Sequence, residues 1–320
     1  MFKNFNRISS NLINQQLKFY NVNEYITVIL KCYIMHYVKA KGIFTSDYGI
    51  NLYRGCTHGC IYCDSRSEIY QLNHKFEDIE VKENAVELLK KELIRRRPFM
   101  VGTGAMTDPY VPIEKRLQYV RKCLKLIYRY GYGFACLTKS DLILRDLDLL
   151  KKINEKTKVV VQITLTTTDE ELCKKIEPNV CPTSKRVEVL ETLNENNIPT
   201  VVWLSPILPY INDTEDNINS ILDFCIDTKV KGVLNLDMGL SLREGNREYF
   251  HKKLDENFPG LKDKYIAEFG DRNFIHGKNY GKLKRIIKNR CQKHGMLYRP
   301  DDIFGYVSEF PSRSVQSKLI

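Results

Sequence analysis

The chain has 320 residues, of which 43% are hydrophobic and 28% are charged, and its formal net charge is +11. This length allows a substantial core, and an aromatic content of 11% with charges of both signs excludes a disordered protein. No apolar run approaches the roughly 18 residues that span a bilayer, and the segment from Ile26 to Met35 lacks the cleavage site of a secretory signal, so we expect a globular cytoplasmic protein without a membrane partner.

The first 34 residues differ from the rest of the chain. They are rich in Asn and Ile, contain neither Gly nor Pro, and precede a second plausible start at Met35. We expect residues 1–34 to be an added extension outside the fold. Residues 35–240 are then expected to form the core, and residues 241–320 a basic, mainly helical C-terminal region.

Three of the ten cysteines lie together just after a short strand-like segment. Cys56, Cys60 and Cys63 have the spacing C-x3-C-x2-C. Three clustered thiolates repel one another unless a cation or a metal cluster offsets their charge. Structural zinc sites normally have four protein ligands, so three cysteines favour a four-iron cluster that leaves one iron open for chemistry. A Cys3His zinc site that uses His58 is the alternative.

Strands and helices alternate after this motif. The apolar spacing predicts helices at 83–96, 115–130, 142–153, 184–194 and 214–228, and strands at 99–103, 133–137, 159–165, 199–204 and 230–236. With the strand before Cys56 they make six βα-type units, which imply a parallel sheet with right-handed crossovers. Because sites of barrel-type sheets form at the carboxyl ends of the strands, we expect one mouth to gather Cys56, Thr107, Lys139, Thr164, Ser205 and Asp237.

The C-terminal end carries most of the excess positive charge. Residues 271–320 contain eleven basic and four acidic side chains, and the stretch from Lys282 to Arg299 contains seven basic side chains and no acid. The apolar spacing of Leu283, Ile286 and Ile287 predicts an amphipathic helix with a solvated face. A surface that contacts phosphates is the alternative.

The cysteine spacing, with the aromatic Tyr62 before the last cysteine, resembles the signature of the radical S-adenosylmethionine (SAM) superfamily. The resemblance implies a [4Fe-4S] cluster on Cys56, Cys60 and Cys63, SAM on the fourth iron, and Tyr62 against the adenine. It also implies that one electron cleaves SAM to a 5′-deoxyadenosyl radical, which removes a hydrogen atom from substrate. The six units match the α/β fold of this superfamily, a partial (βα)6 TIM-type barrel, here with a helical C-terminal extension.

Further segments resemble the spore photoproduct lyase-like branch of that superfamily, which is related to DNA-repair photolyases. The resemblance covers roughly residues 36–270 and is carried by Asn51–Tyr53, Gly102–Pro109, Thr138–Ser140, and Glu177-Pro178 with Arg186. It implies that Thr107, Lys139 and Thr164 contact SAM and that Ser205 lies beside its nucleoside. Such contacts fit the chemistry of SAM, because Lys pairs with a carboxylate and hydroxyls bond to ribose.

Four other polar residues of these segments are candidates for the site. Glu177 and Arg186 are candidates for cofactor binding, and an ion pair that orders their loop is the alternative. Asp108 and Tyr110 follow the second strand and are candidates for catalysis, Tyr110 as a hydrogen donor. For Asp108, which precedes Pro109 at the strand end, a turn-capping role is the alternative.

The chain departs from the lyase pattern at Ala105. The lyase has a cysteine there that returns a hydrogen atom to the substrate radical, and alanine cannot donate one. We therefore expect a radical SAM enzyme that does not repair spore photoproduct by that route. The leading substrate class is a nucleic acid or nucleotide, and a protein or small metabolite is the runner-up. We expect an electron donor such as ferredoxin or flavodoxin; an iron–sulfur sensor and a zinc-binding module are the non-enzyme alternatives.

Overall fold

The computed structural model describes residues 35–46, 48–236 and 239–311. The predicted extension at 1–34 and the predicted mouth residue Asp237 lie outside these residues. The chain divides into two compact units, Met1–His36 and Tyr37–Ile320. The features described below belong to the second unit, except that the first strand begins two residues before it, at Met35. In the part of the chain that is described, no helix is both long and apolar enough to cross a membrane.

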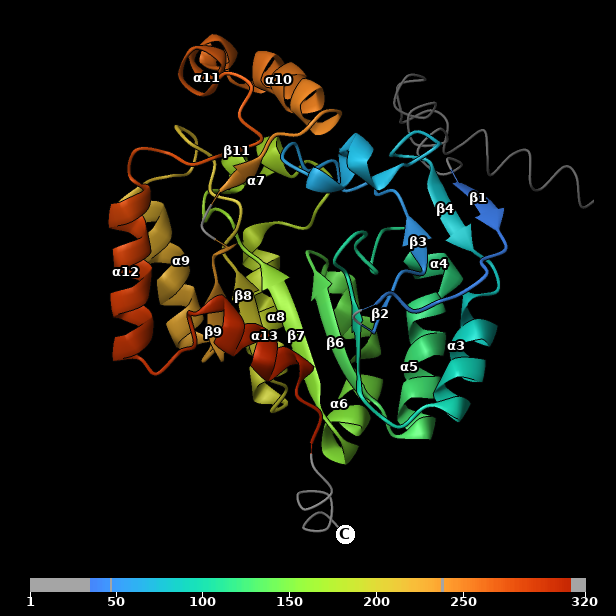
Figure 1. Ribbon diagram of the computed structural model, residues 1–320. Helices are drawn as coiled ribbons and strands as arrows, with labels where there is room; N and C mark the ends of the chain where they lie inside the picture. The colour runs from blue at the N-terminus through green and yellow to red at the C-terminus, as the bar shows by residue number, and fades with distance from the viewer. Residues whose placement is uncertain (1–34, 47, 237–238, 312–320) are drawn as a thin grey trace, which may run out of the picture. The chain divides into compact units, whose positions relative to one another are not determined.

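A six-stranded parallel sheet forms the centre of the second unit (Figure 1). Its strands are in the order β2 (Gly49–Ile50), β5 (Met100–Thr103), β6 (Gly133–Thr138), β7 (Val159–Thr164), β8 (Thr200–Trp203) and β9 (Gly232–Leu234). Every residue of β7 is buried, as expected for a strand that has neighbours on both sides and covered faces. The order follows the sequence, so the sheet curves as an open barrel, and the predicted partial (βα)6 barrel is confirmed.

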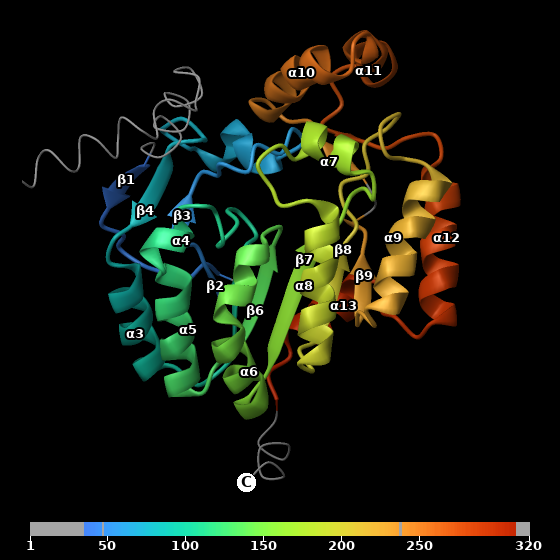
Figure 2. The ribbon, with the colours of Figure 1, turned by 180° about the vertical axis from the view of Figure 1, so that it is seen from behind.

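Helices between the strands cover the outer face of the sheet, as the two ribbon views show (Figures 1 and 2). They are α3 (Ala85–Arg95), α5 (Tyr119–Tyr130), α6 (Leu147–Lys156), α8 (Thr183–Glu195) and α9 (Glu215–Asp227). Two short helices, α4 (Glu114–Leu117) and α7 (Glu170–Ile176), also come between strands, and α7 packs at the mouth against the cysteine-bearing segment. Each longer helix buries one apolar stripe: α5, for example, buries Val120, Cys123, Leu124 and Ile127. Thr214 is the N-cap of α9, and its hydroxyl accepts a bond from the Asn217 amide.

Two predicted helices differ from the structure. The helix predicted at 115–130 is divided into α4 and α5, because Gln118 between them has a left-handed φ of 55°. The helix predicted at 142–153 begins as a 3-10 turn, η3 (Asp141–Asp146), before α6. The unpredicted α7 is a short helix that Asp169 caps by accepting bonds from Glu171 and Leu172 amides at 2.8 and 3.0 Å.

Short strands and turns surround the barrel mouth. One sheet has the order β1 (Met35–Val38), β4 (Ile79–Lys82) and β3 (Tyr53–Arg54), and within the second unit the Val38 carbonyl accepts a bond from the Glu83 amide. A second pair joins β10 (Leu240–Ser241) to β11 (Phe274–Ile275). Two 3-10 turns, η1 (Asp64–Arg66) and η2 (Glu68–Tyr70), follow the three cysteines.

The C-terminal region is helical, as predicted. Two helices, α10 (Asn246–Asn257) and α11 (Leu261–Phe269), cover the segment that carries the cysteines. Their core joins Phe250, Leu254, Tyr265 and Phe269 to Cys60, Ile61 and Tyr62. We call α10 and α11 the lid.

The last two helices pack on opposite sides of the barrel wall. α12 (Tyr280–Lys293) lies outside, beside α9, where Lys282 pairs with Glu215 and Arg290 with Asp223. α13 (Pro300–Ser308) lies inside, where Ile303 packs on inward residues of five strands: Met100, Ala135, Val160, Val201 and Leu234. The C-terminal helix therefore fills the interior of the open barrel.

Candidate active site

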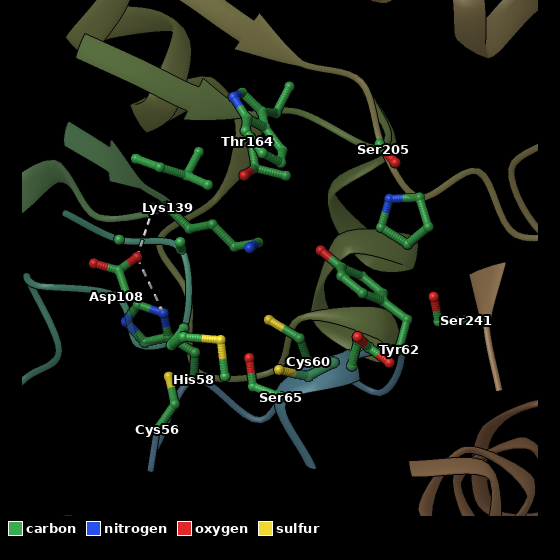
Figure 3. Close-up of a pocket in the computed structure, with 18 of the residues that line it drawn as sticks. Cys56, His58, Cys60, Tyr62, Ser65, Asp108, Lys139, Thr164, Ser205 and Ser241 are labelled. Carbon is green, nitrogen blue, oxygen red and sulfur yellow. Dashed lines mark hydrogen bonds and ion pairs between the residues drawn. The ribbon is translucent and has the colours of Figure 1, made fainter. Parts of the chain in front are cut away.

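A cavity of about 330 Å³ opens at the carboxyl ends of the strands (Figure 3). We call it the strand-end cavity. Of the six residues predicted to meet at this mouth, four line it: Cys56, Lys139, Thr164 and Ser205. Thr107 lines a neighbouring cavity instead, and the preceding residue, Met106, lines both cavities.

The cysteine loop, residues 54–64, is held to the barrel by backbone bonds. The Cys56 amide donates to the Phe76 carbonyl at 2.8 Å, and the Ile61 amide donates to the Ile176 carbonyl at 2.9 Å. Gly59 adopts a φ of 72° and lies against Pro178 and Asn179, where an added Cβ would approach to 3.1 Å. Glycine lets the loop turn at this point without strain.

All three cysteines of the loop line the strand-end cavity as free thiols. Burial raises the pKa of the Cys60 and Cys63 thiols. Burial also acts on Cys56, but the neighbouring His58 outweighs it, and the pKa of the Cys56 thiol is lowered. The site therefore contains one thiol with an imidazole beside it and two that a positive centre would have to ionise.

The spacing of the donors does not suit a single zinc ion. Sulfur atoms around tetrahedral zinc lie roughly 3.8 Å apart, as Zn–S bonds of about 2.3 Å require. Among the described residues, the ligand atoms of Cys56, Cys60 and Cys63 do not all lie within 4.8 Å of one another. His58, the fourth ligand of the zinc alternative, directs its Nδ1 to Asp108 at 3.5 Å. The donor set fits a wider metal group with three thiolate ligands.

Asp108 connects the cysteine loop to the ends of two strands. Its carboxylate accepts bonds from the Thr138 hydroxyl at 2.7 Å and from the backbone amides of Lys139 and Tyr110, both at 2.8 Å. It also faces His58 (Figure 3). The bond to the Tyr110 amide caps the turn as the alternative reading of Asp108 expected. Asp108 lines the cavity, and these contacts make it a positioning residue; a direct role on substrate stays a prediction.

Lys139 extends into the strand-end cavity from the end of β6. Its ammonium lies 5.9 Å from the centre of the Tyr62 ring. Burial acts against the charge, but Cys60, Glu177 and Asp108 outweigh burial and raise the pKa of Lys139. In Figure 3 the side chains of Lys139 and Thr164 face Cys60 and Tyr62 across the cavity. The site therefore offers a cation, a hydroxyl and an aromatic ring to one ligand.

Glu177 and Arg186 do not line the strand-end cavity. Both are buried behind Tyr62, where the Tyr62 hydroxyl donates to one Glu177 oxygen and Arg186 pairs with the other at 2.5 Å. Arg186 also donates to the Thr164 carbonyl at 2.8 Å. This agrees with the alternative in which the two residues order their loop, and it orients Tyr62 and Thr164, which do line the cavity.

Tyr110 also lies away from the strand-end cavity. Its side chain is buried, and its hydroxyl donates to Asp146 at 3.2 Å. Its role as a hydrogen donor stays a prediction. Ala105, by contrast, lines the strand-end cavity, so the position that distinguishes this chain from the lyase pattern faces the site.

Several residues of the site were not predicted from the sequence. They are Ser65, Met106, Trp203, Leu236 and Ser241, which line the strand-end cavity beside the predicted residues. Trp203 ends β8 and is the only tryptophan of the chain, a position that could have marked it. Ser241 comes from β10, whose place at the mouth depends on its pairing with the distant β11.

Known proteins share features of the sequence and of the fold of this chain. The sequence model described as "Radical SAM superfamily" matches residues 50–225. An uncharacterized protein of Methanocaldococcus jannaschii is 35% identical over 216 residues, which cover 67% of this chain and 77% of the relative. An uncharacterized protein of Mycobacterium tuberculosis is 28% identical over 232 residues, covering 68% and 66%. Spore photoproduct lyase complexed with dinucleoside spore photoproduct has a similar fold, with a TM-score of 0.58 at 12% identity over 82% of this chain and 81% of the lyase.

Proposed function

Because this chain belongs to the radical SAM superfamily and is a radical SAM enzyme, we propose that it holds a [4Fe-4S] cluster on Cys56, Cys60 and Cys63. When bound, the cluster supplies one electron for reductive cleavage of SAM, and substrate radical chemistry begins with hydrogen abstraction. The observation that supports this most directly is that three free thiols and Lys139 line one cavity at the strand ends.

Different residues around the strand-end cavity would bind different groups of SAM. The Lys139 ammonium would pair with the carboxylate of SAM, and the Thr164 and Ser205 hydroxyls would bond to its polar groups. Tyr62 would lie against the adenine, held in that orientation by the buried Glu177. Thr107 lines the adjacent cavity, so we propose for it a place nearer the substrate than SAM.

We propose a nucleic acid or nucleotide as the substrate class. The fold similarity to a lyase that was solved with a dinucleoside photoproduct supports this class. The reaction differs from that of the lyase, because Ala105 lines the strand-end cavity without a hydrogen atom to donate. A reductive donor such as ferredoxin or flavodoxin would supply the electron.

The test is an anaerobic assay of the reconstituted protein with dithionite and SAM, in which 5′-deoxyadenosine is measured. We expect the wild type to form it and a Cys60→Ala variant to form none, because two thiolates do not hold the cluster. A matched control is Cys225→Ala, since Cys225 is buried far along the chain in α9 and should leave the product intact. A wild type that carries its cluster and forms no deoxyadenosine, with or without added oligonucleotide, contradicts the proposal.

A further inference from the structure

A second cavity of about 620 Å³ adjoins the strand-end cavity. We call it the side cavity. The two share Ser65 and Met106 in their linings, so they meet at η1, next to the cysteine loop, and at the turn after β5. The other described residues of the side cavity come from β1, β3, β4, η2 and the loops beside them: Val38, Lys39, Ala40, Asn51, Arg54, Gly55, Tyr70, Leu72, Phe76, Glu80, Lys82 and Thr107.

We propose that the side cavity binds a phosphate group of the substrate and so orients a nucleotide toward the strand-end cavity. This inference rests on the proposed function, which it deepens by assigning the part of the site that recognises substrate. Lys39, Arg54 and Lys82 are the groups that would hold the phosphate.

The charges that line the side cavity are unbalanced. The lining contains three basic side chains, those of Lys39, Arg54 and Lys82. It contains one carboxylate, that of Glu80. Arg54 donates to the Tyr70 and Gln71 carbonyls at 3.1 and 3.4 Å, which fix the guanidinium without neutralising it. The Glu80 carboxylate is shared with His74, whose Nε2 lies 3.8 Å away. The cavity therefore retains a net positive charge.

Lys82 gives the strongest indication of an anionic ligand. It is partly buried at the end of β4, and among the described residues its ammonium makes no hydrogen bond or ion pair. Burial lowers the pKa of Lys82, against the opposing effect of Glu80. A partly buried ammonium that makes no direct hydrogen bond or ion pair is costly, even with the Glu80 charge nearby, and a bound anion would reduce that cost.

The remaining lining suits a nucleotide better than a simple carboxylate. Phe76 and Tyr70 offer aromatic surface on which a base can stack. Asn51 and Thr107 offer an amide and a hydroxyl for polar edges. A phosphate held by the three cations presents the group attached to it to Met106 and Ser65, the wall that both cavities share. The attached sugar or base is then directed to the site of hydrogen abstraction.

Binding can be measured without radical chemistry. We would titrate thymidine 5′-monophosphate, thymidine and a short single-stranded oligothymidylate into the cluster-loaded protein with SAM, anaerobically and without reductant. We expect the monophosphate to bind about tenfold or more tightly than thymidine, because charge-assisted bonds to phosphate are strong. A tighter oligothymidylate would indicate an internal phosphate as the natural ligand, and a tighter monophosphate a terminal one.

Variants identify the cavity. Lys82→Gln should weaken monophosphate binding about tenfold and leave thymidine binding unchanged, whereas Lys82→Arg should retain most of the affinity. Lys39→Gln, in an exposed loop that tolerates substitution, should weaken binding in the same direction. The matched control is Lys91→Gln, an exposed lysine on α3 outside both linings, which should change nothing.

Two results would overturn the proposal. One is equal affinity for thymidine and its monophosphate, and the other is monophosphate binding that Lys39→Gln and Lys82→Gln leave unchanged. If deoxyadenosine forms but either result is found, the side cavity is not a phosphate site and the radical function stands. If the variants lose phosphate binding while no deoxyadenosine forms, the phosphate site stands and the proposed function fails.

Discussion

At the scale of single residues, the position of Tyr62 depends on side chains that do not line the strand-end cavity. Its hydroxyl donates to Glu177, which is buried and paired with Arg186 at 2.5 Å. A buried ion pair contributes little net stability by itself, but removing one partner leaves an uncompensated charge in the interior. The pair therefore acts on the site by fixing the ring and by making any other arrangement of this loop costly.

The first prediction follows from that pair. Glu177→Gln keeps the shape of the side chain and removes its charge, so Arg186 is left without a counter-ion. We expect the free energy of unfolding of the metal-free chain to fall by about 3–5 kcal/mol, measured by urea denaturation. Glu171→Gln, which breaks an exposed pair with Lys174, should cost less than about 0.5 kcal/mol. Similar losses in both variants would contradict the argument.

The same pair predicts a dependence on pH. Burial alone would raise the pKa of Glu177, but Arg186 and Lys139 outweigh it and lower the pKa below the usual 4.5. A lowered pKa contributes stability that is complete above the unfolded value and is lost as the pH falls through the folded value. The stability difference between wild type and Glu177→Gln should therefore stay constant from about pH 7 to about pH 5 and shrink below about pH 4. Paired urea titrations measure it, and a difference that grows on acidification would refute the assignment.

The sequence predicts the residues of this site unevenly. Cys56, Cys60 and Cys63 are recognisable because their chemistry depends on short local spacing. Lys139 and Ser205 come just after strands and Thr164 ends one, so a topological rule is enough to bring them to one mouth. Glu177 is different: its place behind Tyr62 is set by where α7 packs on the cysteine loop, and no local pattern records that contact.

At the scale of elements, the lid joins the end of the chain to the cysteine loop. Arg66, just after the third cysteine, lies between the rings of Phe76 and Tyr249, with its guanidinium 4.2 and 3.7 Å from their centres. Tyr249 belongs to α10, so this stack connects the lid to η1, which follows the cysteine loop. Such contacts around a cation are favourable where water is excluded.

We predict that Phe250→Ala loosens the lid without unfolding the barrel. Phe250 is fully buried in the lid core, and its truncation leaves a cavity worth about 3–5 kcal/mol. Amide hydrogen exchange should become faster in α10 and α11 and stay unchanged in β6 and β7, because the two regions have separate cores. Lys252→Ala, exposed on the same helix, is the control. Faster exchange throughout the sheet would contradict a separate lid.

Helices and strands were predictable from the sequence where one buried face gives them a regular apolar pattern. The strands and helices of the barrel have strong apolar patterns, and all six predicted strands are present. The break at Gln118 was not predictable, because a left-handed residue inside an apolar pattern is imposed by packing: the Glu114 carboxylate there accepts bonds from the Tyr119 and Val120 amides at 2.9 and 3.1 Å. The insertion of α13 into the barrel is a tertiary contact without a local signature.

At the scale of the whole molecule, the basic helix α12 lies away from both cavities, since none of its residues lines either of them. Five of the six basic residues of α12 divide into two groups, and the sixth, Lys284, donates to the Tyr280 hydroxyl at 3.0 Å. Lys282 and Arg290 pair with acids of α9, which supports the amphipathic-helix interpretation of this segment. Arg285, Lys288 and Lys293 are exposed and add to a positive surface that attracts any polyanion.

The exposed basic residues of α12 should affect the salt dependence of oligothymidylate binding and leave monophosphate binding unchanged. Changing Arg285, Lys288 and Lys293 together to Gln should flatten the slope of log affinity against log salt for oligothymidylate by up to about 2, since each phosphate contact contributes about 0.7 for single strands. Binding of thymidine 5′-monophosphate should not change, because these residues line neither cavity. An oligothymidylate slope identical to that of wild type would show that α12 contacts no phosphate.

The lid lies far from the cysteine loop in the sequence although the two share a core. The loop ends near residue 64, and α11 ends at Phe269. At a synthesis rate of 5–20 residues per second, the ribosome needs roughly 10–40 s to make the intervening segment of about 200 residues. During that interval the thiols are made but their cover is not, so the order of translation itself leaves a period in which the proposed cluster would reach them before α10 and α11 close over the loop.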